Sequence, residues 1–456
     1  MKIYNSATHT KEEFVPHEPG KVSMYTCGPT VYHFAHIGNL RSYIMEDVLE
    51  KLLRYAGYDV TRVMNITDVG HLASDADTGE DKMLKGAQRE HKTVMEIAQF
   101  YTDAFFADCK KLNIKYPDVV QPATGMIGDY IKVISSLIDR GYAYFAGGNV
   151  YFDTSKLEKY YVFNDHDEED LAVGVREGVE EDANKRNKND FVLWFTKSKF
   201  EDAGPRTMGY AVGQQGPSGL AHRVLLYLHE VCWGAPGHPL RRHRQRFPHH
   251  TNEIAQSEAY LGHPWCKYWV HIHHLNTNSG KMSKSKGEFL TVSLLEEKGY
   301  DPLVYRFFCL QSHYRKGLVF SWENLDNAKA AYDKLVARVA ALSGEGTVDE
   351  GAVERFKNDF LEAVGNDLNT SLGVTALYDV LKAGVNDATK RATLDSFDQV
   401  LGLELLSHAD ALKAQQAAPV EGAEEIEALI AKRLEAKRAK NWAEADAIRD
   451  QLRAMG

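Results

Sequence analysis

Lysine and serine side chains that can hold a polyphosphate are concentrated in one glycine-bounded segment, Gly280-Lys281-Met282-Ser283-Lys284-Ser285-Lys286-Gly287, called here the lysine loop. Lysine ammonium groups supply compact charge for phosphate oxygens, serine hydroxyls add hydrogen bonds, and glycines let the backbone approach an anion closely. Such a loop can stabilise the charge that develops on a leaving pyrophosphate. The same composition also occurs in exposed surface loops, so ATP binding needs support from a second feature.

A second candidate phosphate site lies near the N-terminus. The segment Lys21–Cys27 has the composition of a β-strand and runs through a Gly-Pro-Thr turn to His36-Ile37-Gly38-Asn39. Apolar residues then recur at helical spacing, at Ile44, Val48, Leu52 and Leu53. His36 and Asn39 should therefore lie at a helix N-terminus, where free N–H groups and the helix dipole favour phosphate. A histidine at this position is also a common helix cap, and only its pairing with the lysine loop indicates ATP.

These two elements, in this order, resemble the two hallmark motifs of class I aminoacyl-tRNA synthetases, and the chain is most similar to the cysteinyl-tRNA synthetase family. The residues that carry the resemblance are Tyr25-Thr26-Cys27-Gly28-Pro29-Thr30-Val31-Tyr32, Asn65-Ile66-Thr67-Asp68, Phe247-Pro248-His249-His250-Thr251-Asn252-Glu253 and the lysine loop. The similarity extends over nearly the whole chain. The family's first tetrad often ends in His, and here Asn39 takes that place with an amide that can still donate to a phosphate.

The resemblance implies ATP-dependent activation of L-cysteine to cysteinyl adenylate, with Mg²⁺, followed by transfer to tRNA(Cys). It implies that the residues binding ATP are His36, Gly38, Asn39, Lys281, Ser283, Lys284 and Ser285. Of these, the catalytic residues would be His36, Asn39, Lys281 and Lys284, and the cysteine substrate would lie against Cys27, Gly28 and Thr67. Positioning and charge stabilisation can carry an in-line displacement, so no covalent enzyme intermediate is expected.

Selection of cysteine over serine calls for a metal ion, because the two amino acids differ mainly by sulfur in place of oxygen. Zn²⁺ bonds a thiolate far better than an alcohol. Cys27, His249 and Glu253 offer sulfur, nitrogen and oxygen ligands, and His249 and Glu253 should share one helix face. That spacing is also ordinary for a surface pair on a helix. The resemblance implies that these three residues hold one Zn²⁺ per chain.

Two further motifs of the family's substrate site are missing from the chain. One is Gly-Trp-His-Ile-Glu-Cys-Ser, which supplies a second cysteine ligand, and the other is Asp-Ile-His-x-Gly-Gly-x-Asp. Between Asp202 and Phe247 the chain is instead rich in Gly, Pro, His and Arg. Cys232 lies in a different sequence context and is not expected to be the missing ligand.

A shift of reading frame accounts for this loss. Gly219–Leu225 can be encoded GGG CTG GCA CAT CGA GTG CTC, and dropping the first base gives GGC TGG CAC ATC GAG TGC TC, which encodes Gly-Trp-His-Ile-Glu-Cys-Ser once completed. The same offset lets Gly237–Gln245 encode Asp-Ile-His-Ser-Gly-Gly-Ile-Asp-Asn. We infer a base gained near Ala203 and a base lost near Arg246, in the gene or in its sequencing. The chain as written should lack the ligand that would lie near Val224 and activate cysteine poorly.

The alternation of strand and helix patterns predicts an α/β fold. The resemblance implies a class I synthetase Rossmann-like parallel sheet with an inserted connective domain, followed by a C-terminal helical bundle. The expected divisions are residues 1–120 (first half of the catalytic domain), 121–190 (connective insertion), 191–290 (second half, with 203–246 frame-shifted), 291–344 (stem-contact helices), 345–410 (tRNA-binding bundle), 411–424 (linker) and 425–456 (anticodon-contacting helices). The second half is expected to begin with the strand Phe191–Phe195.

Composition limits the classes of protein to which the chain can belong. Its 456 residues, 44% of them hydrophobic, are enough for about three domains. No segment approaches the roughly 18 apolar residues of a membrane span, and Met1–Asn5 does not resemble a signal peptide. The five cysteines show no disulfide pattern. We therefore expect a cytoplasmic protein that does not bind a membrane. Separately from composition, we expect it to be a monomer.

A net charge of −10 argues against nucleic-acid binding over the whole surface, although phosphate contacts depend on local patches. One basic patch near the C-terminus comprises Lys432, Arg433, Lys437, Arg438, Lys440, Arg449 and Arg453. It resembles the family's anticodon-contacting tail, and it also fits a solvated helix face. Two alternatives to a tRNA ligase stay open: a cysteine-activating ligase of thiol biosynthesis, and a catalytically impaired RNA-binding relative.

Overall fold

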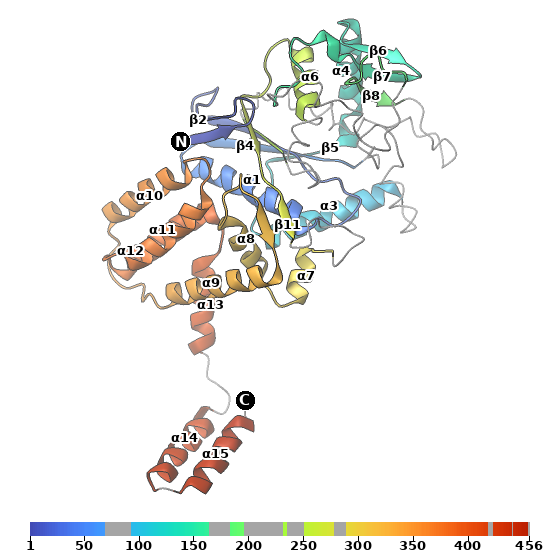
Figure 1. Cartoon of the computed structure of the whole chain (residues 1–456). Helices are drawn as coiled ribbons and strands as arrows, with labels where there is room; N and C mark the ends of the chain where they lie inside the picture. The colour runs from blue at the N-terminus through green and yellow to red at the C-terminus, as the bar shows by residue number, and fades with distance from the viewer. Residues whose placement is uncertain are drawn as a thin grey trace.

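A five-stranded parallel sheet forms the centre of the computed structural model, which describes residues 1–68, 93–163, 183–195, 231–234, 250–277, 289–417, 423–439 and 441–454. Its strands, in spatial order, are β10 (Tyr268–His271), β9 (Val231–Gly234), β3 (Lys21–Thr26), β4 (Asp59–Ile66) and β5 (Val119–Pro122). All four strand pairs are parallel. The structure therefore confirms the predicted α/β fold with a parallel sheet (Figure 1).

Helix α1 (Ile37–Tyr55) connects β3 to β4 and covers one face of the sheet. Its buried residues include Ile44, Val48 and Leu52, which pack in the main core with Met24 and Met64 of the strands. Both faces of β4 are buried along most of its length, as expected for a strand inside a parallel sheet. The helical spacing seen in the sequence thus corresponds to the face of α1 that rests on the sheet.

The connective insertion forms a small α/β unit beyond the end of the sheet. Its elements are α4 (Ile127–Asp139) and an antiparallel sheet of β6 (Ala143–Ala146), β7 (Asn149–Phe152) and β8 (Phe191–Phe195). The expectation that Phe191–Phe195 returns to the catalytic sheet is wrong, because β8 pairs with β7. An unbroken apolar run has no periodicity that tells which sheet it joins, so the sequence alone does not identify the partner of this strand.

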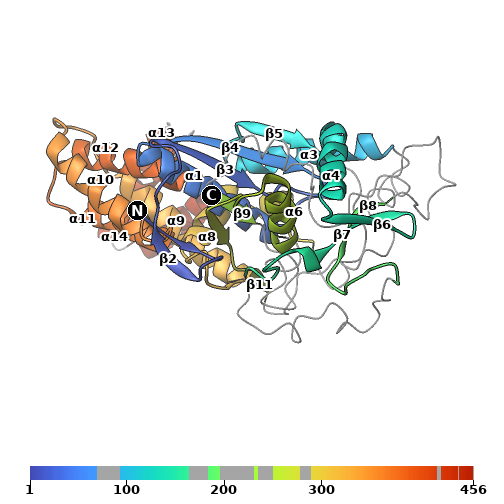
Figure 2. The ribbon, with the colours of Figure 1, turned by 90° about the horizontal axis from the view of Figure 1, so that it is seen from above.

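Helix α6 (Thr251–Leu261) packs against this insertion. Ala255 and Ala259 of α6 lie in one apolar cluster with Val133 and Leu137 of α4. Seen from above, the insertion lies at one end of the sheet and the helical bundle at the other (Figure 2). The start of α6, where Glu253 is found, is thereby held beside the sheet.

Strand β9 lies inside the stretch assigned to a shifted frame. It pairs with β3 on one side and with β10 on the other, and so occupies a central position in the sheet. The segment Val-Cys-Trp-Gly is short and bordered by Gly, Pro and His, so it gives little strand signal.

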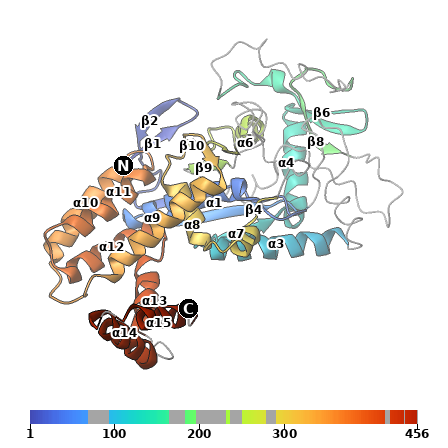
Figure 3. The ribbon, with the colours of Figure 1, turned by 60° about the horizontal axis from the view of Figure 1, so that its bottom comes forward.

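The chain after residue 290 is mainly helical, as the sequence predicts. The helices of this region are α7 (Val292–Glu297), α8 (Pro302–Leu310), α9 (Trp322–Ala340), α10 (Glu350–Val364), α11 (Thr370–Lys382), α12 (Asp387–Leu401) and α13 (Leu405–Ala417). Capping residues set their limits: Asp301 accepts the Leu303 N–H before α8, and Gly402 ends α12 with a positive φ. Figure 3 shows α13 leading from this bundle toward the last two helices.

The predicted linker at 411–424 is shorter than expected. Helix α13 continues through Ala417, and α14 (Ala423–Arg438) begins six residues later. Alanine and glutamine are good helix formers, which explains why the Ala-Gln-rich stretch extends the helix. The predicted last helical pair is confirmed, since α14 packs on α15 (Trp442–Ala454).

Short strands complete the described part of the chain. β1 (Lys2–Asn5) and β2 (Thr10–Glu13) form a hairpin, and β11 (Leu275–Thr277) pairs in parallel with β12 (Leu318–Phe320). Helix α3 (Val94–Lys111) precedes β5. Among the described residues, no helix has the length and apolar character needed to cross a membrane.

Candidate active site

His36 is the N-cap of α1, so the predicted helix start is confirmed. The Asn39 N–H donates to His36 Nδ1 at 3.2 Å. A ring nitrogen that accepts carries no hydrogen, so in the neutral ring the hydrogen is on Nε2, which can donate to a phosphate. Gly38 and Asn39 lie in the first turn, where helix N–H groups and the dipole favour an anion.

The residues directly after the lysine loop contact this helix start. Ile37 N–H donates to Leu290 O at 2.9 Å. The Phe289 ring lies edge-on to His33 and His36, with centroid distances of 4.6 and 6.1 Å. Lys281, Ser283, Lys284 and Ser285 themselves lie outside the described residues. The contacts therefore place Phe289 and Leu290, two and three residues after the loop in the sequence, at the predicted phosphate site.

Asn65 joins the ends of the two central strands. Its Oδ1 accepts from Gly28 N–H at 2.7 Å and from the Tyr25 hydroxyl at 3.1 Å, and its Nδ2 donates to Thr67 Oγ1 at 3.3 Å. A Cβ on Gly28 would lie 1.6 Å from Asn65 O, so only glycine fits there. Gly28 and Thr67, both predicted to lie against substrate, are thus brought together by one side chain.

A candidate metal centre lies next to this turn. Ligand atoms of Cys27, His250 and Glu253 all lie within 4.8 Å of one another. The sequence predicts His249 in place of His250, and His249 lies outside the described residues. Cys27 and Glu253 therefore meet as predicted, and the histidine beside them in the structure is the second of the His-His pair.

The electrostatics of these side chains fit a cation. Burial, with Glu253 nearby, raises the pKa of the Cys27 thiol, and burial raises the pKa of Glu253 to about 8. Among the described residues, Glu253 Oε2 is buried without a hydrogen-bond partner. An acceptor left unpaired in a buried place is costly, and a metal ion would satisfy it. Sulfur, nitrogen and oxygen ligands are those that Zn²⁺ prefers.

His271, the last residue of β10, contacts the histidine of this centre. Its Nε2 lies 2.7 Å from His250 Nδ1. If His271 accepts, His250 carries its hydrogen on Nδ1 and presents Nε2 as a metal ligand, which is the usual arrangement for metal-binding histidine. His271 therefore orients His250.

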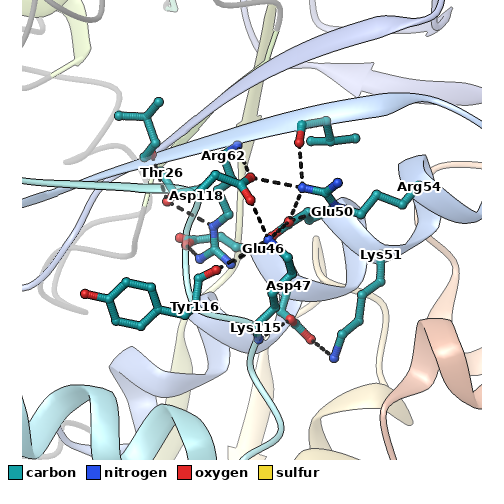
Figure 4. A network of polar contacts seen from close by, with 12 residues as sticks. Thr26, Glu46, Asp47, Glu50, Lys51, Arg54, Arg62, Lys115, Tyr116 and Asp118 are labelled. Atoms are coloured by element: carbon teal, nitrogen blue, oxygen red, sulfur yellow. Dashed lines mark hydrogen bonds and ion pairs between the residues drawn. The ribbon is translucent and has the colours of Figure 1, made fainter.

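A network of charged residues lies between β3, β4 and α1 and includes Thr26 at the end of β3 (Figure 4). Arg62 of β4 contacts Glu46 at 3.2 Å and Glu50 at 3.4 Å, and its Nε donates to Thr26 Oγ1 at 3.3 Å. Lys115 contacts Glu50 at 2.9 Å from the far side. Thr26 directly precedes Cys27, so this network supports the strand end that carries the thiol.

Glu46 should make the stability of the fold depend on pH. Burial, only partly opposed by Arg62, raises its pKa from 4.5 to about 8. Between these values the folded chain retains a proton that the unfolded chain has released, so stability falls as pH rises, by up to about 1.4 kcal/mol per pH unit. Urea unfolding from pH 5 to 8 should show a shallower decline for Glu46→Gln than for the wild type. Equal slopes would contradict the raised pKa.

Some of these residues carry a signal in the sequence and others do not. Asn65 belongs to a motif that carries the resemblance, and His250 stands beside the predicted ligand. No sequence pattern indicates His271 or Arg62, because each contacts residues that are distant in the sequence and become neighbours only in the folded chain.

Two family models match the chain. The one described as tRNA synthetases class I (C) catalytic domain matches residues 13–330, and the one described as cysteinyl-tRNA ligase anticodon binding domain matches residues 421–456. The cysteine–tRNA ligase of Treponema denticola is 41% identical over 485 residues, covering 100% of this chain and 96% of that protein. Cysteine–tRNA ligase 1 of Burkholderia lata is 38% identical over 462 residues, covering 100% and 94%.

Solved structures share the fold at low sequence identity. A Mycobacterium tuberculosis methionyl-tRNA synthetase bound to methionyl-adenylate has a TM-score of 0.54 at 13% identity and covers 85% of this chain and 91% of that one. An Agrobacterium radiobacter LeuRS in a ternary complex has a TM-score of 0.56 at 10% identity, covering 90% and 86%. With both the fold and the full-length relatives in agreement, the chain belongs to the cysteine–tRNA ligase family.

Proposed function

We propose that the chain is a cysteine–tRNA ligase, which activates L-cysteine with ATP and attaches it to tRNA(Cys). The proposal rests mainly on one observation: three structural features lie together at the carboxyl ends of neighbouring parallel strands. Cys27 follows β3, Thr67 follows β4, and the His36 end of α1 faces the residues after the lysine loop. Ligands of open α/β sheets bind at this edge.

In this proposal His36, Gly38 and Asn39 hold the ATP phosphates from the helix side, with Mg²⁺ accompanying the nucleotide. Lys281 and Lys284, aided by Ser283 and Ser285, hold them from the lysine loop. The cysteine carboxylate attacks the α-phosphorus, and the bond to the β-phosphate oxygen breaks to release pyrophosphate. The terminal ribose hydroxyl of the tRNA then attacks the carbonyl carbon and displaces AMP. The side chains position and neutralise charge without forming a covalent intermediate.

The proposed metal is Zn²⁺, held by Cys27, Glu253 and a histidine of the His249-His250 pair. When bound, it would supply direct coordination of the substrate sulfur, which distinguishes a thiolate from an alcohol. Asn65 keeps Gly28 and Thr67 beside Cys27, so the substrate's amino and carboxylate groups have a fixed surface to lie on. His271 orients His250 through its ring nitrogen.

The C-terminal helices are proposed to contact tRNA. Residues 421–456 match the anticodon-binding domain of the family, and α14 and α15 contain six of the seven residues of the basic patch. A cysteine-activating ligase of thiol biosynthesis would not need this extension, so that alternative is disfavoured. We further propose that the protein acts as a monomer in the cytoplasm.

ATP binding tests the nucleotide half of the proposal without requiring turnover. The full chain should bind Mg-ATP in calorimetry, and Lys284→Ala should weaken the affinity by about tenfold or more, because a charge-assisted contact to phosphate is lost. Lys286→Ala is the matched control, since it removes the same charge from the same loop outside the proposed phosphate-binding set. Equal effects of the two substitutions would contradict the assigned role of Lys284.

A further inference from the structure

Arg41 lies in the second turn of α1 and is fully buried. Its guanidinium donates to main-chain carbonyl oxygens of two separate segments. Its Nη1 lies 2.6 Å from His273 O and 3.0 Å from His274 O, while its Nη2 lies 2.9 Å from Lys316 O and 3.5 Å from His313 O. Through its two terminal nitrogens, the buried guanidinium binds carbonyls of both segments and holds them at a fixed distance from α1.

The two segments are the beginning of the β11–β12 ribbon. His273 N–H donates to Tyr314 O at 2.8 Å, and Leu318 N–H donates to His274 O at 3.4 Å. The parallel pairing of Leu275 with Leu318 follows directly. β11 ends at Thr277, and the lysine loop begins three residues later in the sequence. Arg41 therefore anchors the ribbon that leads into the loop.

The chain after the loop is tied to the same helix. Ile37 N–H donates to Leu290 O at 2.9 Å, and the buried Tyr305 hydroxyl donates to Ile37 O at 2.7 Å. The first two turns of α1 thus carry His36 and also contact the chain on both sides of the lysine loop. Neither anchor uses a group assigned to ATP or to the metal centre.

We propose that Arg41 is a positioning residue for ATP, with Tyr305 as its counterpart at the second anchor. Arg41 fixes the ribbon to α1, and the Tyr305 hydroxyl holds the Ile37 peptide, whose N–H donates to Leu290 O. Together they fix the described chain on both sides of the lysine loop, up to Thr277 and from Leu290, relative to His36. Lysine cannot replace Arg41, because one ammonium group cannot reach carbonyls on both segments as a planar guanidinium does. The proposal rests on the ATP site proposed above.

Equilibrium binding of Mg-ATP to the full chain tests this role. Arg41→Lys should raise the Kd for ATP by about tenfold, because small misplacements of binding groups are costly. Arg306→Lys is the matched control: Arg306 is equally buried and donates to Leu112 O and Leu401 O, away from the loop. It should lower stability with less than about a twofold change in Kd. Tyr305→Phe, which keeps the ring, should raise the Kd severalfold and serves if Arg41→Lys does not fold.

A double-variant cycle separates positioning from general destabilisation. In a Lys284→Ala background, Arg41→Lys should add little to the Kd, because the contact that it positions is already gone. If Arg41→Lys raises the Kd for ATP by the same factor in the Lys284→Ala background as in the wild type, the proposal is overturned. Equal Kd values for Arg41→Lys and Arg306→Lys would also overturn it. Failure of the wild-type chain to bind ATP would instead contradict the proposed function, and the positioning role would fall with it.

Discussion

A chain in which residues 203–246 are replaced by the translation of the alternate frame should activate cysteine at least about a hundredfold faster than the chain as written. The replacement restores Gly-Trp-His-Ile-Glu-Cys-Ser, whose cysteine would complete the ligands offered by Cys27 and Glu253. Loss of one ligand weakens metal binding and leaves the substrate thiolate without its partner. Cysteine-dependent exchange of pyrophosphate into ATP measures the effect.

The control is the restored chain with serine in place of the motif cysteine, which should return to the low rate. Metal analysis after dialysis should find one zinc per restored chain and far less in the chain as written. One tightly held zinc in the chain as written would contradict the frame-shift account. So would a nucleotide sequence whose codons do not permit the alternate frame between Asp202 and Phe247.

Replacement of Arg62 by methionine should lower the free energy of unfolding by about 3–5 kcal/mol. Arg62 is fully buried and contacts two carboxyl groups, Glu46 and Glu50, that are also fully buried. Removal of Arg62 takes away one of the cations that contact the buried Glu50 and leaves the buried Glu46 carboxyl without its hydrogen-bond partner. The bond to Thr26 is lost as well, so the strand end at Cys27 should become less ordered. Urea unfolding at neutral pH measures the loss of stability.

Arg54 provides the matched control, because it also contacts Glu50, at 2.9 Å, but its side chain is 33% exposed. Arg54→Met should lower the free energy of unfolding by less than about 1 kcal/mol, because water screens a partly exposed ion pair. Similar losses in the free energy of unfolding for Arg54→Met and Arg62→Met would contradict the claim that burial makes the Arg62 contacts stronger.

Local patterns in the sequence were sufficient to predict the strand that precedes α1 and α1 itself. The apolar spacing from Ile44 to Leu53 defines the buried face of α1, and His36 is the N-cap that the sequence predicts. The placement of β8 could not be predicted, because an apolar strand fits either sheet until its partner is known. The choice of partner is a tertiary effect.

The residues of the candidate site also fall into two groups: those that the sequence predicts and those that are recognised only from the fold. Cys27 and Glu253 were predicted because their types and a family resemblance identify them, and they meet in the structure. Arg41, Arg62 and His271 act through main-chain carbonyls or neighbouring side chains on distant strands and loops. The residues next to them in the sequence give no indication of these contacts. Residues that hold a site in position without being part of it are therefore recognised only when the fold is known.

Attachment of cysteine to tRNA is the measurement that tests the central claim most directly. The chain with residues 203–246 restored, supplied with Mg-ATP and tRNA(Cys), should form cysteinyl-tRNA and should form almost no product with serine at the same concentration. Absence of cysteinyl-tRNA from a folded, ATP-binding, zinc-loaded chain would contradict the assignment as a cysteine–tRNA ligase. Equal charging with serine would contradict selection of the substrate by its thiolate.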